Sequence, residues 1–223
     1  MSTATPTAPA PQRDREPAIS LLLYYLLRNL IVYPLFKFYF RGRVEGLENV
    51  PMAGKLLVVS NHASDFDPPF VATAVSRPVA FMAKEELFKI PLLGPAIRHY
   101  GAYPVKRGSA DRAALRAALT VVDEGWATGL FLDGTRTADG RIHSPKVGAA
   151  LIASKTQAPV LPVSIWGADK IFQPGSKWPR PVPLTVRIGK PMAPPPPKAS
   201  RQELDDFTQL CVDRIHGQMD LGR

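Results

Sequence analysis

The stretch LLVVSNHASDFDPP, residues 56–69, decides how this chain is organised. It is apolar and β-branched up to Ser60, which predicts a buried strand, and Pro68 after Asp67 predicts that a helix opens there. His62 lies between strand and helix. Histidine takes a proton near neutral pH, and a carboxylate such as Asp67 can fix its tautomer and stabilise its charged form. The pair has what is needed to deprotonate an alcohol, although a helix N-cap beside an ordinary hydrogen-bonded histidine would look the same.

Beyond this stretch, apolar strands alternate with amphipathic helices. Helices are expected over 109–124 and over 200–219, where Ser200 and Glu203 match a capping box. Cys211 falls on the apolar stripe of the second helix and is expected in the core. Strands are expected over 55–60, 78–83, 100–105, 128–132, 159–165 and 183–188. This alternation predicts the α/β class: a layered domain over residues 44–223 with a central, mostly buried sheet flanked by helices.

The N-terminal part differs in composition. Residues 1–17, rich in Pro, Ala and Thr, are expected to form a disordered tail. Residues 18–43 are apolar and aromatic, but Arg28 and Pro34 interrupt them. The pattern favours two short helices lying in a membrane interface, with basic residues including Arg28 facing anionic lipid. A kinked single span and a helix packed on the core are the alternatives. Because no small-residue cleavage site follows the apolar segment, we do not expect a cleaved signal peptide. The protein is therefore expected at the cytoplasmic face, as a peripheral or monotopic membrane protein.

The formal charge of +9 indicates an anionic partner, which could be nucleic acid, a phosphorylated ligand or an acidic membrane. Aromatic residues cluster with leucines rather than alternating with cations, so nucleic acid is the weakest of the three. With one cysteine the chain has no internal disulfide, which suits a reducing compartment.

Polar residues follow two further strands. The block 101–107, GAYPVKR, ends in Lys106 and Arg107, and the block 131–136, FLDGTR, carries an acid, a glycine and an arginine. Arginine can grip a phosphate with two parallel hydrogen bonds. Ligands bind at the carboxyl edge of α/β sheets, so blocks at several strand ends indicate one site. A fourth block, 160–163, carries no reactive group and can only shape a wall.

These four blocks, in this order, resemble the glycerolipid acyltransferases of the 1-acyl-glycerol-3-phosphate acyltransferase type. Residues 61–67 match the family's His-x4-Asp block, and 101–107 resemble its Gly-x-x-Pro-Val-x-Arg block. Residues 131–136 resemble Phe-Pro-Glu-Gly-Thr-Arg, with Leu132 and Asp133 in place of the usual Pro and Glu. The shorter Asp133 puts the identity of the acceptor in doubt more than the chemistry.

The resemblance implies acyl transfer from acyl-CoA or acyl carrier protein to the hydroxyl of a lysophospholipid, with no cofactor, no metal and no covalent acyl-enzyme. His62 would be the general base and Asp67 would orient it. Arg107 and Arg136 would hold the acceptor phosphate. The remaining substrate-binding candidates are Asp133 at the glycerol, its neighbours Gly134 and Thr135, and the weaker cations Lys84 and Lys106.

Two other functions compete with this one. A metal-dependent hydrolase could use His62, Asp65 and Asp67, although the remaining histidines are too scattered to complete a ligand set. A non-catalytic protein could bind anionic lipid through the N-terminal segment and the basic charge alone. Acyltransferases acting on a different lysolipid would carry nearly the same blocks.

Overall fold

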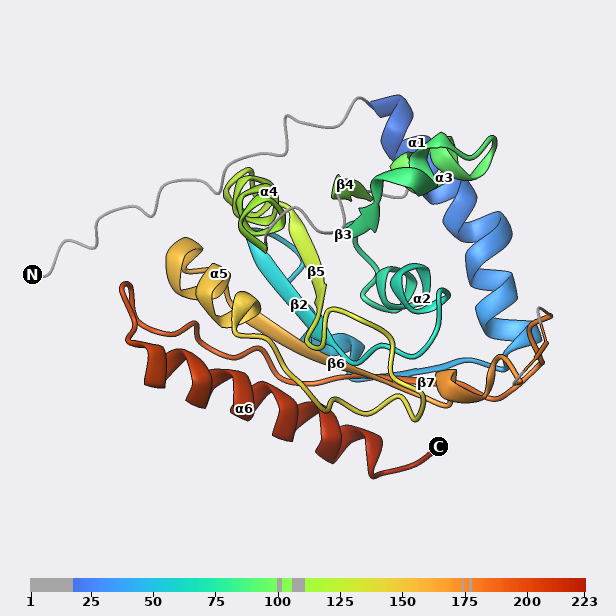
Figure 1. Ribbon diagram of the computed structural model, residues 1–223. Coiled ribbons are helices and arrows are strands. Elements are labelled where there is room, and N and C mark those ends of the chain that lie inside the picture. Colours follow the sequence, from blue (N-terminus) through green and yellow to red (C-terminus); the bar gives the residue numbers. More distant parts are fainter. Residues whose placement is uncertain (1–17, 100–101, 106–110, 174, 177) are drawn as a thin grey trace, which may run out of the picture.

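The computed structural model describes residues 18–99, 102–105, 111–173, 175–176 and 178–223 (Figure 1). The expected tail, 1–17, lies outside them. Seven strands form one mixed sheet in the order β1-β7-β6-β2-β5-β3-β4, in which β7 runs antiparallel to β6 and the five strands from β6 to β4 are parallel. The strands are β1 Arg43–Glu45, β2 Leu56–Ser60, β3 Val79–Lys84, β4 Tyr103–Val105, β5 Ala127–Phe131, β6 Val160–Trp166 and β7 Thr185–Ile188.

The α/β class and all six expected strands are confirmed, within the described residues. The strand β1 was not expected, because its three residues are all exposed and carry no periodic signal. The helices are α1 Ala18–Leu27, α2 Asp67–Ala74, α3 Leu93–His99, α4 Asp111–Asp123, α5 Gly148–Thr156 and α6 Arg201–Met219. The capping box of α6 is present: Ser200 N–H donates to Glu203 Oε2 at 2.6 Å, and Glu203 N–H donates to Ser200 Oγ at 3.2 Å.

Helices cover both faces of the sheet (Figure 1). Alternate residues of β2 point to opposite faces, as a strand dictates. Leu56 and Val58 join a core with α2 and the N-terminal helix, whereas Leu57 and Val59 join a second core with α4, α5 and α6. Cys211 lies in the second core, as expected, and burial raises the pKa of its thiol to about 12. The thiol therefore stays protonated at neutral pH.

The expectation of two separate N-terminal helices was wrong. Helical structure is continuous from Ala18 to Tyr39, with π-helical turns over Arg28–Val32 and Leu35–Tyr39. Pro34 keeps helical angles, φ −59° and ψ −43°, between these two wider turns. Because π turns shift the hydrogen-bond register, a residue without an N–H can be accommodated there. Leu21–Tyr39 is long and apolar enough to cross a membrane, judged by length and composition.

The C-terminal helix α6 is tied to the loop before α5 by His216, whose Nε2 accepts from Ile142 N–H at 3.0 Å. Burial and the nearby Arg141 lower the pKa of His216, against a smaller opposing effect of Asp220. In the folded protein this histidine therefore releases its proton at a lower pH than in the unfolded chain.

We expect stability to fall with acidification because of His216. The unfolded chain binds the extra proton from about pH 6.5 downward, so the free energy of unfolding should be undiminished near pH 8 and decrease toward pH 5. His216→Phe should cost about 1 kcal/mol at pH 8, because Ile142 N–H loses its acceptor, and should flatten this decrease. Urea unfolding at several pH values measures both effects. Substitution of the exposed His143 by Gln should keep the decrease; if it alone removes it, the assignment to His216 is wrong.

Candidate active site

The candidate site lies at the carboxyl edge of the parallel strands. Ser60, the last residue of β2, is in register with Phe131, the last residue of β5, and Leu132 N–H donates to Ser60 O at 3.1 Å. The residues that follow β2 and β5 therefore emerge side by side. This adjacency brings the His-x4-Asp block next to the block 131–136, as the strand-end pattern predicts.

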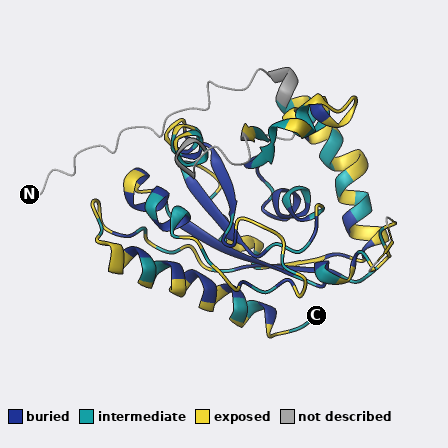
Figure 2. Cartoon of the chain, in the orientation of Figure 1, coloured by how far each residue is buried: buried dark blue, intermediate teal, exposed yellow. Residues whose placement is uncertain are grey.

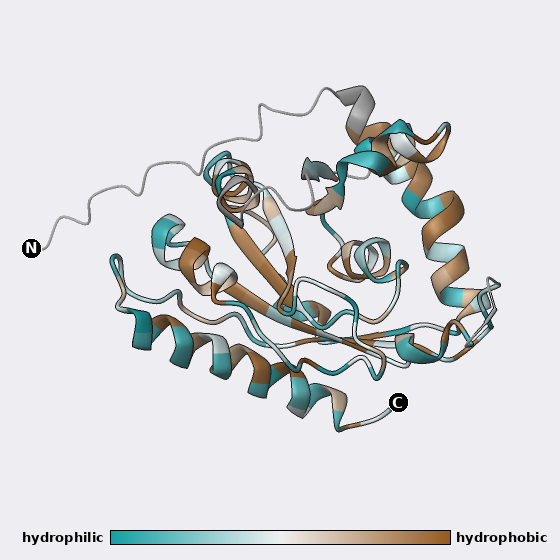
Figure 3. Ribbon diagram, viewed as in Figure 1, coloured by the Kyte–Doolittle hydropathy of each residue, from teal (hydrophilic) through white to brown (hydrophobic). Residues whose placement is uncertain are grey.

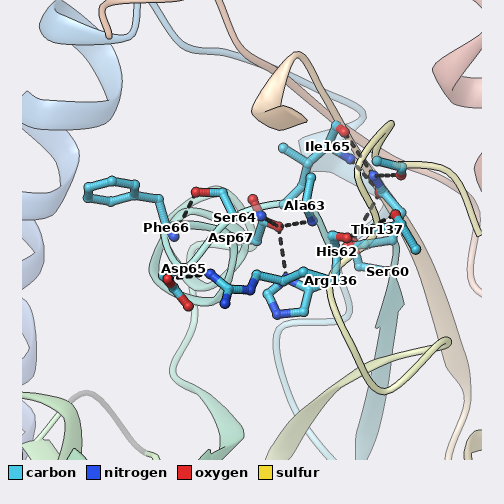
Figure 4. A network of polar contacts seen from close by, with 12 residues as sticks. Ser60, His62, Ala63, Ser64, Asp65, Phe66, Asp67, Arg136, Thr137 and Ile165 are labelled. Atoms are coloured by element: carbon cyan, nitrogen blue, oxygen red, sulfur yellow. Dashed lines mark hydrogen bonds and ion pairs between the residues drawn. The ribbon is translucent and has the colours of Figure 1, made fainter. Parts of the chain in front are cut away.

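His62 and Asp67 form a hydrogen-bonded pair (Figure 4). His62 Nδ1 lies 2.9 Å from Asp67 Oδ2, and the same oxygen accepts from the backbone N–H groups of Ala63 at 2.7 Å and Ser64 at 2.8 Å. The Asp67 side chain is fully buried, while that of His62 is 16% exposed. With Nδ1–H donating to the carboxylate, the lone pair of the neutral ring lies on Nε2. In this arrangement Nε2 is the ring nitrogen that can accept a proton from a bound substrate.

The plane of the His62 ring is set by Phe131. The two rings stack with centroids 3.9 Å apart and an interplanar angle of 10°. Phe131 in turn stacks on Phe81 of β3, at 5.3 Å. The imidazole is thus held by a carboxylate at one edge and by an aromatic face, which restricts it to one orientation.

Asn61 locks the backbone before the histidine. Its side-chain amide donates to Gly140 O at 2.8 Å and to Ile165 O at 3.0 Å, and its oxygen accepts from Ile165 N–H at 2.8 Å. On the other side, Thr137 N–H donates to His62 O at 2.9 Å. These bonds join the end of β2 to β6 and to the loop after β5, so three elements position His62 together.

Arg136 pairs with Asp65, which lies between the histidine and the aspartate of the first block (Figure 4). Its Nη1 lies 2.5 Å from Asp65 Oδ2, and the two side chains are 48% and 75% exposed. Exposed ion pairs contribute at most about 1 kcal/mol. An anionic ligand can therefore compete with Asp65 for the guanidinium.

The carboxylate of Asp133 faces backbone rather than Arg136. Its Oδ2 accepts from His143 N–H at 3.2 Å and its Oδ1 from Ser144 N–H at 2.7 Å, and the residue is 6% exposed. Asp133 thereby closes the loop that carries Arg136 and Thr137. Gly134 follows in the left-handed region, at φ +66°, where glycine is favoured.

The structure describes the positions of only some of the other predicted substrate-binding residues. Lys84 ends β3 and is in register with Val105 of β4, so it lies at the same edge of the sheet as His62. Thr135 is exposed in the turn after β5. Three residues of the second block lie outside the described residues: Gly101, Lys106 and Arg107.

Comparison with known protein families shows to which family this chain is related. The model of the family described as Acyltransferase matches residues 41–166, just over half of the 223 residues. The chain belongs to the acyltransferase family. The matched region begins just before β1 and ends with β6, so it contains all the site residues described above.

Individual acyltransferases resemble it closely. The 1-acyl-sn-glycerophosphate (LPA) acyltransferase PlsC from Thermotoga maritima has a TM-score of 0.69 and 32% identity, with 92% of this chain and 88% of that chain covered. A chloroplastic 1-acyl-sn-glycerol-3-phosphate acyltransferase of Brassica napus is 34% identical over 68% of this chain and 44% of its own length. One of Borreliella burgdorferi is 29% identical over 68% and 61%. The alignments thus span less than two thirds of these curated relatives.

Sequence reasoning missed three contributors to this candidate site. Asp65 entered only as a ligand of the metal-hydrolase alternative, whereas it pairs with Arg136. Phe131 and Asn61 were quoted within blocks without a role. A signal for Phe131 existed, because the final residue of a strand next to β2 must lie beside whatever follows β2. The bonds of Asn61 to Ile165 join residues 104 positions apart, and no local pattern reports them.

Proposed function

We propose that this acyltransferase moves an acyl group from acyl-CoA or acyl carrier protein to the free hydroxyl of a lysophospholipid. Its acceptor in this proposal is 1-acyl-glycerol 3-phosphate and its product is phosphatidic acid, a step of phospholipid biosynthesis. The observation that carries the proposal is the His62–Asp67 pair at 2.9 Å in a chain of this family. The names of the relatives supply the acceptor.

The chemistry requires one base and no enzyme nucleophile. His62 Nε2 takes the proton of the acceptor hydroxyl as its oxygen attacks the thioester carbonyl carbon. The C–O bond forms, the C–S bond breaks, and the imidazolium returns the proton to the departing thiolate. Asp67 keeps Nδ1 protonated and stabilises the imidazolium between these two transfers. General-base catalysis contributes about 100- to 10,000-fold, and positioning of the two substrates adds to it.

Arg136 is proposed to hold the phosphate of the acceptor, with Arg107, Lys84 and Lys106 as further cations. Two observations support this role for Arg136. Its side chain is exposed, and its ion pair with the exposed Asp65 is weak enough for a phosphate to replace. Asp133 shapes the loop that presents Arg136, so its contact with the glycerol, and that of Gly134 and Thr135, remains a proposal. Acceptor and product are lipids and the donor is water-soluble, so we place the enzyme on the cytoplasmic face of a membrane.

The decisive experiment is transfer from radiolabelled acyl-CoA to lysophosphatidic acid, with acyl carrier protein as the alternative donor. Labelled phosphatidic acid from the wild-type protein supports the proposal. Lack of product with both donors, in protein shown to be folded, would direct the search to other lysolipids. Binding of anionic lipid without any transfer would favour the non-catalytic alternative.

Arg136→Ala should raise the KM for the phosphorylated acceptor about 10- to 100-fold and leave kcat within a few fold. A charge-assisted hydrogen bond contributes about 1.5–3 kcal/mol, which gives this range. Initial rates at varied acceptor concentration measure both constants. Arg201→Ala is the matched control, since that arginine also pairs with one exposed aspartate but lies on α6. An unchanged KM in Arg136→Ala would remove the residue from the phosphate site.

A further inference from the structure

The first block carries a second carboxylate, Asp65, which the proposed reaction does not use. Its side chain is 75% exposed, whereas that of Asp67 is fully buried. Within the part of the chain that the structure describes, the polar partner of Asp65 is Arg136, and an exposed pair of this kind contributes little to stability. An acid beside the cation that is proposed to hold a phosphate weakens the attraction of that cation for an anion. The placement of Asp65 therefore bears on which ligand the site accepts.

Both charges are fixed to the backbone that carries His62. Around Asp65, Ser64 N–H donates to Asp67 Oδ2 at 2.8 Å, and Asp67 N–H donates to Ser64 O at 3.1 Å. The residue after Arg136 donates its N–H to His62 O at 2.9 Å. The Asp65 side chain can change its rotamer, but its carboxylate stays close to Arg136 whichever ligand binds. Any group that reaches Arg136 therefore meets both charges.

The pair faces water rather than the apolar core. The segment between β5 and α5, which carries Arg136, is exposed over much of its length and is largely hydrophilic, as Figures 2 and 3 show. An acyl chain gains nothing from such a surface, because it would stay in contact with water. The part of a lipid acceptor that lies against this pair is therefore its polar head group.

Arg136 has room for a second anion beside Asp65. Its guanidinium bonds to Asp65 through Nη1, and among the described residues no partner bonds to Nε or Nη2. A phosphate can bind at these two nitrogens through parallel hydrogen bonds while Asp65 stays in place. The cation then lies between two anions. A positive group attached to the phosphate would balance the charge of Asp65.

The charge of the acceptor decides how Asp65 acts on it. A phosphomonoester, as in 1-acyl-glycerol 3-phosphate, carries a charge of about −2 near neutral pH and is repelled by the carboxylate. A phosphodiester carries a single negative charge, and an ammonium group beyond it can pair with Asp65. A site that discriminates between ligands in this way uses repulsion of one as well as attraction of the other.

We propose that Asp65 and Arg136 together recognise a zwitterionic head group, so that this chain also acylates lysophospholipids with an ammonium group beyond the phosphate, such as lysophosphatidylethanolamine. Arg136 binds the phosphate and Asp65 binds the ammonium. The inference rests on the proposed function for the reaction and adds a class of acceptor to it. The bonds are the same: the glycerol oxygen bonds to the acyl carbon, the C–S bond breaks, and the departing thiolate receives the proton.

Three acceptors with the same acyl chain test the proposal: lysophosphatidylethanolamine, lysophosphatidylglycerol and lysophosphatidic acid. The first two are phosphodiesters that differ in the ammonium group. With wild-type protein and radiolabelled acyl-CoA, we expect the KM for lysophosphatidylethanolamine to lie about tenfold below that for lysophosphatidylglycerol. Equal KM values for these two would overturn the proposal. So would transfer to lysophosphatidic acid without any transfer to lysophosphatidylethanolamine.

Asp65→Asn removes the charge and keeps the size of the side chain. We expect it to raise the KM for lysophosphatidylethanolamine about tenfold and to lower that for lysophosphatidic acid about threefold, with kcat within a few fold for both. Asp65→Glu should keep the wild-type order of acceptors, because it keeps the charge. The matched control is Asp205→Asn, which should change neither KM, since Asp205 also pairs with an exposed arginine but lies on α6. A change by the same factor for all acceptors in Asp65→Asn would show that Asp65 does not read the head group.

Binding measurements separate this inference from the proposed function. Calorimetric titration of a short-chain lysophosphatidylethanolamine, below its critical micelle concentration, into wild-type and Asp65→Asn protein needs no turnover. Weaker binding by the variant, without acyl transfer by either protein, would keep the head-group recognition and reject the proposed reaction. Transfer to lysophosphatidic acid with equal binding by both proteins would reject the recognition and keep the reaction. Lack of binding to the wild-type protein would also reject the recognition.

Discussion

His62→Ala should remove nearly all acyl transfer while the protein stays folded. Removal of the base forces the acceptor hydroxyl to attack with its proton in place, and we expect a fall in kcat of about 100- to 10,000-fold. The side chain is 16% exposed and contacts mainly Asp67 and the Phe131 ring, so its loss leaves little of the core disturbed. Single-turnover rates with radiolabelled acyl-CoA measure the effect, and a thermal melt checks the fold.

The matched control for this variant is His143→Ala. His143 also lies close to an aspartate, with Nε2 2.9 Å from Asp139 Oδ1, but the pair is exposed and is not connected to Asp67. It should retain nearly full activity. If His62→Ala keeps a rate within a few fold of wild type, the general-base assignment is wrong, whatever the reaction proves to be.

The sequence predicted the core of this site because strand order translates directly into proximity. A buried strand ending at Ser60 and another ending near Phe131 must deliver the residues after them to one edge if they are parallel neighbours. The His62–Asp67 contact could be predicted from local sequence alone, since a turn from a strand into a helix N-terminus brings these two positions together. The capping box of α6 and the burial of Cys211 followed from local pattern in the same way.

Contacts between distant elements were beyond such reasoning. Whether Arg136 meets Asp133 or Asp65 depends on how the loop after β5 folds back, and no local sequence pattern reports that. The continuous helix through Pro34 was also missed, because propensity treats proline as a break and cannot register the π turns around it. In both cases the local sequence allows more than one conformation, and packing against distant parts of the chain determines which one forms.

Asp67→Asn separates the charge of this carboxylate from its structural role. The amide oxygen of asparagine can accept the bonds that Asp67 Oδ2 now accepts from His62, Ala63 and Ser64, so the loop and the helix start should persist. What is lost is the negative charge that stabilises the imidazolium. We expect kcat to fall about 100- to 10,000-fold with little change in the KM for acceptor, in contrast to Arg136→Ala. Steady-state kinetics at varied acceptor concentration distinguish the two.

Two further variants serve as comparisons for Asp67→Asn. Asp67→Ala leaves the buried N–H groups of Ala63 and Ser64 without their acceptor, so it should also destabilise the fold by about 2–5 kcal/mol. Asp65→Asn alters the neighbouring carboxylate, which is exposed and pairs with Arg136, and should change kcat by only a few fold. Activity in Asp67→Asn close to wild type would mean that imidazolium stabilisation is not part of the rate. Asp67 would then serve only to position the histidine, a role that the unchanged geometry of the amide can still perform.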